Sequence, residues 1–155
     1  MQTTPHLLVG AAIGSQFHNP ILIATAAAGS HFLLDSLPHL GFFLANGRVG
    51  AQYNVEDLDR GDIAFVTADA ALGLAILILL THNNPSAELI WLGAFCGFLP
   101  DLHHTLQIFL GPEKLKKYIK IHQKFHYKKR ISILTGFATQ VLTAVAAILL
   151  VLRHS

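Results

Sequence analysis

The sequence contains a single cysteine, Cys96, which excludes an internal disulfide and a thiolate-rich metal site. Charged residues make up only 13% of the 155 residues, while 52% are hydrophobic. There is no glycine-rich phosphate loop, no GxSxG element and no dinucleotide-binding fingerprint. These absences argue against the common nucleotide-dependent enzymes and serine hydrolases. The most prominent feature that is present is a series of long apolar runs.

The apolar runs are long enough to predict a membrane protein. Residues 62–81 and 131–152 each supply about 20 largely apolar residues, enough to cross a hydrocarbon core of about 30 Å. Residues 20–45 and 86–110 are as long, and each is interrupted by a proline and one acid. The shorter stretch 6–17 can cross only if the bilayer thins or if it packs against its neighbours. We therefore predict one all-α domain, residues 1–155, built as a polytopic bundle of about five membrane helices.

The basic residues are concentrated in two connections. Eight of the eleven lie between Lys114 and Arg130, and two more lie in the loop 46–61. By the positive-inside rule, both connections and the N-terminus are expected to be cytoplasmic. Because the membrane explains this basic charge, nucleic-acid binding is not predicted.

Residues 113–129 have the pattern of an amphipathic helix that lies in the cytoplasmic interface. One face carries apolar side chains together with His122 and His126, which are four residues apart and suit metal chelation. The other face carries Lys116, Lys120 and Lys124, which we expect to contact lipid headgroups or phosphate.

Several ionisable residues interrupt the apolar runs, where a charge is costly unless it is paired, hydrated or bound. Counting about 1.5 Å per helical residue from the outer end places Asp35 roughly 22 Å, Asp101 roughly 21 Å and Asp69 roughly 18 Å deep. His6 and His31 come out at roughly 18 and 16 Å. Antiparallel helices thus bring these groups to one layer in the cytoplasmic third of the bilayer.

Two local patterns within this layer predict metal ligands. His31 and Asp35 lie four residues apart and share a helix face. Pro100 favours a helix break, after which Asp101 and His104 share a face. The alternatives are a buried His–Asp hydrogen bond that joins helices, and a simple proline kink with a capping aspartate. Asp69 belongs to no such local pattern. It is predicted to be a ligand, a general base or the partner of an interhelix hydrogen bond.

The predicted ligand set combines imidazoles and carboxylates, which fits zinc best, with manganese or iron as alternatives, and one or two ions. His39 and His103 are expected to support the ligands through hydrogen bonds or to serve as alternative ligands. The predicted ligands are His6, His31, Asp35, Asp69, Asp101, His104, His122 and His126.

The chain resembles the predicted membrane-bound metal-dependent hydrolases, the YdjM-like proteins of the bacterial inner membrane. The resemblance rests on Pro5-His6-Leu7-Leu8-Val9-Gly10, on Leu99-Pro100-Asp101 with His104, and on His122 with His126. In this chain Asp101 is followed by Leu102-His103-His104, where the family often has Asp-hydrophobic-Asp-His. The ligand helices are also loosely similar to those of zinc-dependent phospholipase C and P1 nuclease, which implies a phosphoester substrate.

These observations predict a membrane-embedded hydrolase that acts on a phospholipid or another amphiphilic phosphoester through a metal-activated water. Asp69 or Asp101 is the expected general base, and His122 or His126 the expected proton donor to the leaving group. Two alternatives from other classes stay open. The first is a divalent-ion carrier or channel, and the second is a non-catalytic metal-binding membrane module.

Overall fold

The computed structural model describes residues 1–40, 60–127, 129 and 131–154, without the side chains of residues 104, 105, 108 and 112. Within these parts the chain is entirely helical, as predicted. Most of the loop 46–61 lies outside the described residues. The elements are α1 (Thr3–Gln16), α2 (Pro20–Ser36), α3 (Arg60–Thr81), α4 (Ala87–Phe98), the 3₁₀ turn η2 (Leu99–Asp101), α5 (Leu102–Leu110), α6 (Pro112–His122) and α7 (Ile133–Arg153).

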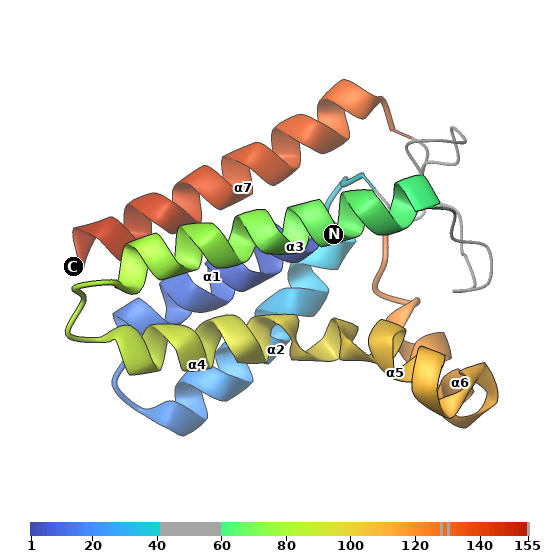
Figure 1. The fold of residues 1–155 in the computed structure, drawn as a ribbon, viewed down its shortest axis with the longest axis horizontal. Coiled ribbons are helices and arrows are strands. Elements are labelled where there is room, and N and C mark those ends of the chain that lie inside the picture. The colour runs from blue at the N-terminus through green and yellow to red at the C-terminus, as the bar shows by residue number, and fades with distance from the viewer. Residues whose placement is uncertain (41–59, 128, 130, 155) are drawn as a thin grey trace.

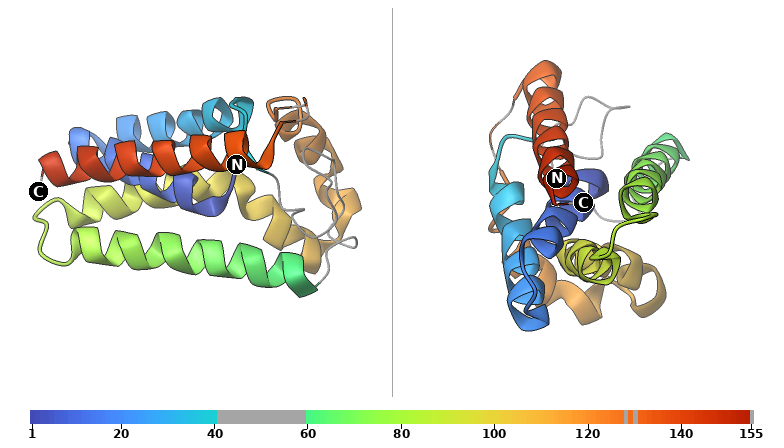
Figure 2. Two further views of the ribbon diagram at one scale, coloured as in Figure 1. Left: turned by 90° about the horizontal axis from the view of Figure 1, so that it is seen from above. Right: turned by 90° about the vertical axis from the view of Figure 1, so that its left-hand side faces the viewer.

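The shortest predicted span, α1, is the central helix of the bundle. It packs against α2, α3, α4 and α7, and most of its residues are buried (Figures 1 and 2). Its apolar residues Leu7, Leu8 and Ala11 join Leu77 of α3 and Ile90 of α4 in the hydrophobic core. A helix enclosed in this way buries apolar side chains all around its axis, which is why α1 has no polar stripe.

Glycines allow α1 and α4 to approach each other closely. A Cβ at Gly93 would lie 2.1 Å from the carbonyl oxygen of Gly10, and one at Gly10 would lie 2.2 Å from that of Gly93. Gly97 likewise faces the carbonyl oxygen of His6, at 2.6 Å from its hypothetical Cβ. This small-residue contact sets His6 beside the end of α4.

The predicted helix break at Pro100 is confirmed. Because proline lacks an N–H and its ring crowds the preceding turn, α4 ends at Phe98 and continues as η2 and then α5. The break places Asp101 at the junction, where it lies against α2 and α1. In the same way, α2 ends at Ser36, shortly before Pro38.

The amphipathic helix is shorter than the predicted segment 113–129. α6 ends at His122, and residues 123–126 continue in turns. The backbone N–H of Tyr127 then donates to the carbonyl of Asp35 at 2.8 Å, which ties this segment to the end of α2. Figure 1 shows α5 and α6 at the end of the bundle at which α3 and α7 begin.

Of the described helices, only α3 and α7 are long and apolar enough to cross a membrane. About five membrane helices are therefore not supported. The breaks near Pro38 and Pro100 shorten the second and fourth predicted spans, and α1 has only 14 residues.

Candidate metal centre

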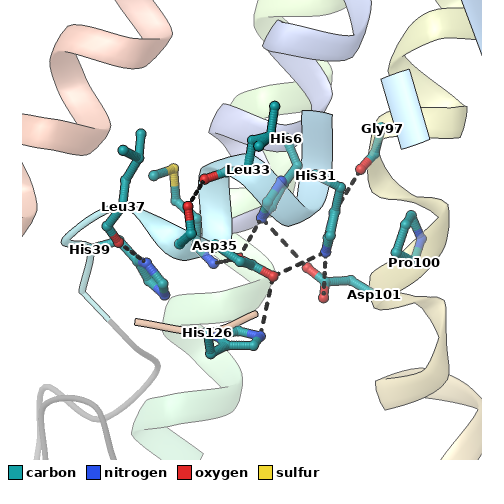
Figure 3. A network of polar contacts seen from close by, with 12 residues as sticks. His6, His31, Leu33, Asp35, Leu37, His39, Gly97, Pro100, Asp101 and His126 are labelled. Carbon is teal, nitrogen blue, oxygen red and sulfur yellow. Dashed lines mark hydrogen bonds and ion pairs between the residues drawn. The ribbon is translucent and has the colours of Figure 1, made fainter. Parts of the chain in front are cut away.

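Five side chains from four segments converge at the end of the bundle where α6 lies. They come from α1 (His6), α2 (His31 and Asp35), η2 (Asp101) and α6 (His122), and all are buried. Figure 3 shows His6, His31 and Asp101 pointing toward Asp35. The predicted convergence of antiparallel helices therefore occurs for Asp35 and Asp101.

Asp35 lies at the centre of this group, and its two oxygens have different partners. Its Oδ2 lies 3.2 Å from Nε2 of each of His31, His122 and His126. Its Oδ1 lies 3.2 Å from Nε2 of His6 and also contacts the α-amino group of Met1. Four imidazoles and the α-amino group thus surround one buried carboxylate, which is stable only with positively charged partners.

His31 shows most directly where that charge is needed. Its Nδ1–H donates to the carbonyl oxygen of Gly97 at 2.8 Å, which fixes the ring. Its Nε2 is buried and faces Asp35 Oδ2 at 3.2 Å and Asp101 Oδ1 at 3.4 Å. A lone pair opposite two carboxylate oxygens is repulsive, so this position calls for a proton on the imidazole or for a cation between the three groups.

The arrangement fits a metal ion. Ligand atoms of His31, Asp35, Asp101 and His122 all lie within 4.8 Å of one another, so these residues could hold one ion. Imidazole and carboxylate are the donors that zinc, manganese and iron accept. The bond from His31 to the Gly97 carbonyl is also the usual support of a metal-binding histidine, because it fixes the tautomer and the ring orientation.

The ligand atoms of a second group, Asp35, His39 and His126, also lie within 4.8 Å of one another. Burial lowers the pKa of His39 to about 4 and that of His126 to about 3, so both imidazoles are neutral near pH 7. His39 donates its Nδ1–H to the carbonyl of Leu37 at 2.7 Å, which leaves its Nε2 as the acceptor nitrogen. Both rings therefore offer a lone pair.

The other predicted site residues lie elsewhere or cannot be placed. Asp69 accepts a hydrogen bond from the backbone N–H of Thr4 at 3.0 Å, and it belongs to neither candidate group of the described residues. His103 donates to the carbonyl of Pro100 at 2.8 Å and packs against His122. The side chain of His104 lies outside the described residues. Lys116, Lys120 and Lys124 are exposed around α6 and the turn after it.

The supporting contacts were not found by sequence reasoning. The carbonyl of Gly97 accepts the bond from His31, and no local pattern in the sequence indicates this contact. Tyr118 donates its hydroxyl hydrogen to Pro100 at 2.9 Å, which holds α6 against the break between α4 and α5. In the sequence, the one indication that Tyr118 lies near the site is its place on the apolar face, four residues before His122.

No family model, curated protein or solved structure matches this chain.

Proposed function

We propose that this protein is a membrane-embedded, metal-dependent hydrolase whose centre is formed by His31, Asp35, Asp101 and His122, with zinc as the preferred ion. The observation that carries this proposal is the buried Nε2 of His31 between two carboxylates, with its Nδ1–H already committed to Gly97. The sequence resemblance to YdjM-like proteins of the bacterial inner membrane points in the same direction.

Membrane embedding is supported by the distribution of apolar side chains. In the most apolar 18-residue stretches of α3 and α7, only 11% and 17% of the residues are buried inside the bundle. A core helix of a soluble protein is mostly buried. Leu79 and Leu134 are each 77% exposed, while the ionisable cluster is enclosed. An apolar exterior around a polar interior is the arrangement that lipid favours. We place the metal end of the bundle at the cytoplasmic face, beside the basic segment of α6.

The centre opens on the side of His126, whose side chain is 33% exposed while those of Asp35 and His122 are at most 1% exposed. A bound divalent ion would lower the pKa of a water from about 15.7 towards 7 and polarise a phosphoryl oxygen. The Asp101 oxygen that does not hold the ion would accept the water proton, because Asp69 accepts a hydrogen bond from Thr4 and belongs to neither ligand group. The water oxygen would then bond to phosphorus as the phosphorus–oxygen bond to the alcohol breaks.

The leaving oxygen then takes its proton from solvent, because His126, with its low pKa, is unprotonated near neutral pH. The lysines of α6 favour an anionic amphiphile, such as a phospholipid, over a neutral one.

The test is elemental analysis of the detergent-purified protein, combined with hydrolysis of phosphatidylglycerol in mixed micelles. We expect stoichiometric metal and metal-dependent turnover, with both lost in His31→Ala. The matched control is His82→Ala, which removes an exposed histidine just after the end of α3. Absence of stoichiometric metal from the folded wild-type protein would contradict the proposal.

Deep burial also favours a second candidate, a non-catalytic metal site that stabilises the bundle. Structural metal sites are closed, whereas catalytic sites keep one position open to water or substrate. His6, His31 and Asp35 are fully buried, which fits a closed site. Stoichiometric metal without hydrolysis of any phosphoester, together with a lower melting temperature after chelation, would select this candidate.

A further inference from the structure

Besides the four residues assigned to the proposed centre, the structure contains an adjoining set of metal-type ligands. His39 follows the end of α2, and His126 lies in the turn after α6. With Asp35 they form a second group whose ligand atoms lie within 4.8 Å of one another. Figure 3 shows His39 and His126 on one side of Asp35, and His31 and Asp101 on the other.

We propose that the protein holds two divalent ions, with Asp35 bridging a first site, formed with His31, Asp101 and His122, and a second site, formed with His39 and His126. The proposal rests on the proposed metal centre and specifies its nuclearity. Asp35 is the one residue that both groups share. A carboxylate has two oxygens and about four lone-pair sites, so it can serve two ions at once.

The second group has the same kind of outer support as the first. His39 donates its Nδ1–H to the Leu37 carbonyl at 2.7 Å, just as His31 donates to Gly97 at 2.8 Å. In each case a backbone carbonyl fixes the tautomer and leaves Nε2 as the donor atom for a metal. His126 Nε2 already lies 3.2 Å from Asp35 Oδ2, and its ring packs edge-on against that of His39, with centroids 5.6 Å apart.

The two sites should fill in order. The first offers two carboxylates and two imidazoles, whereas the second offers two imidazoles and a share of Asp35. We therefore expect the second ion to bind more weakly than the first.

The experiment is a titration of the metal-free, detergent-solubilised protein with Zn²⁺, followed by elemental analysis, in parallel with Mn²⁺ loading and electron paramagnetic resonance. We expect two ions per chain in the wild type and a spin-coupled signal from the manganese pair. His39→Gln should bind one ion and show an uncoupled signal, because the substitution removes the imidazole nitrogen that would bind the second ion. His126→Gln should behave in the same way, and Asp35→Asn should lose both ions.

Matched controls separate this inference from the proposed function. His82→Gln, at the far end of the bundle, should keep two ions and the coupled signal. One ion per wild-type chain, unchanged in His39→Gln and without spin coupling, would overturn the second site and leave the first intact. No bound ion in the folded wild type would overturn both proposals.

Discussion

The imidazole of His31 on α2 lies 3.4 Å, Nε2 to Oδ1, from the carboxylate of Asp101 at the break between α4 and α5. Both residues are buried, and the Gly97 carbonyl on α4 accepts the other ring hydrogen of His31. The Gly97 carbonyl near the end of α4 therefore fixes one side of this imidazole, and the carboxylate of Asp101 lies on its other side. Positive charge on or beside this imidazole therefore stabilises the junction of α2 and α4.

Removal of metal is expected to destabilise the fold. A ligand at 100 times its dissociation constant stabilises the folded state by about 2.7 kcal/mol. For a chain of this size, EDTA should then lower the melting temperature by about 5–10 °C, measured by scanning fluorimetry in detergent. Asp101→Asn should melt at a lower temperature and respond little to the chelator. Identical wild-type melting curves with and without EDTA would mean that no ion supports the fold.

A methyl group at the contact between α1 and α4 should be poorly tolerated. Gly93→Ala would place Cβ 2.1 Å from the Gly10 carbonyl oxygen, so the two backbones must separate. We expect a loss of about 3 kcal/mol in the free energy of unfolding, together with weaker metal binding, because α4 carries the Gly97 carbonyl that supports His31 and leads directly to Asp101. Urea titration monitored by tryptophan fluorescence measures the first effect.

Gly29 provides the matched control for this substitution. It is exposed on α2, and a Cβ there would meet nothing within 4 Å. Gly29→Ala should therefore stabilise the protein by about 0.5–1 kcal/mol, the usual gain within a helix. Equal effects of the two substitutions would show that close packing of α1 and α4 is unimportant.

Asp69 is expected to act as a cap for α1. Its Oδ2 accepts a hydrogen bond from the Thr4 backbone N–H in the first turn, where an anion also interacts favourably with the helix dipole. Asp69→Ala should lower the free energy of unfolding by about 1–3 kcal/mol without changing the metal content. Asp69→Asn keeps an acceptor oxygen and should lose less. Loss of hydrolysis in Asp69→Asn, with stability and metal content unchanged, would instead favour a role as general base.

Local patterns in the sequence predicted part of this arrangement. The spacing of His31 and Asp35 placed them on one helix face, and Pro100 marked the break that positions Asp101. Both features depend only on helix geometry and on the chemistry of proline, so a single sequence can reveal them.

Other features depend on contacts between distant segments. The bond between Thr4 and Asp69, and the carbonyls that support the histidines, exist only once the helices have packed. Helical periodicity continued to residue 129, but α6 ends at His122. The turn that follows brings His126 to Asp35 by tertiary packing, since Tyr127 donates to the Asp35 carbonyl. Periodicity describes local preference and cannot report such a turn.

The lysines of the α6 region should control the preference for anionic substrates. Lys116, Lys120 and Lys124 are exposed, and Lys116 forms a solvent-exposed ion pair with Glu113 at 3.2 Å. Each lysine near an anionic surface contributes about 1 kcal/mol, so replacing all three with glutamine should weaken apparent affinity for phosphatidylglycerol by up to about 100-fold. Turnover of a zwitterionic phospholipid and the metal content should change little. The measurement is the initial rate of hydrolysis in mixed micelles as the mole fraction of anionic lipid and the salt concentration are varied.

A matched variant, Lys116→Arg with Lys120→Arg and Lys124→Arg, keeps the charge and should behave like the wild type. Equal loss of activity toward both lipids in the glutamine variant would show that these lysines support the fold of α6 instead of attracting substrate.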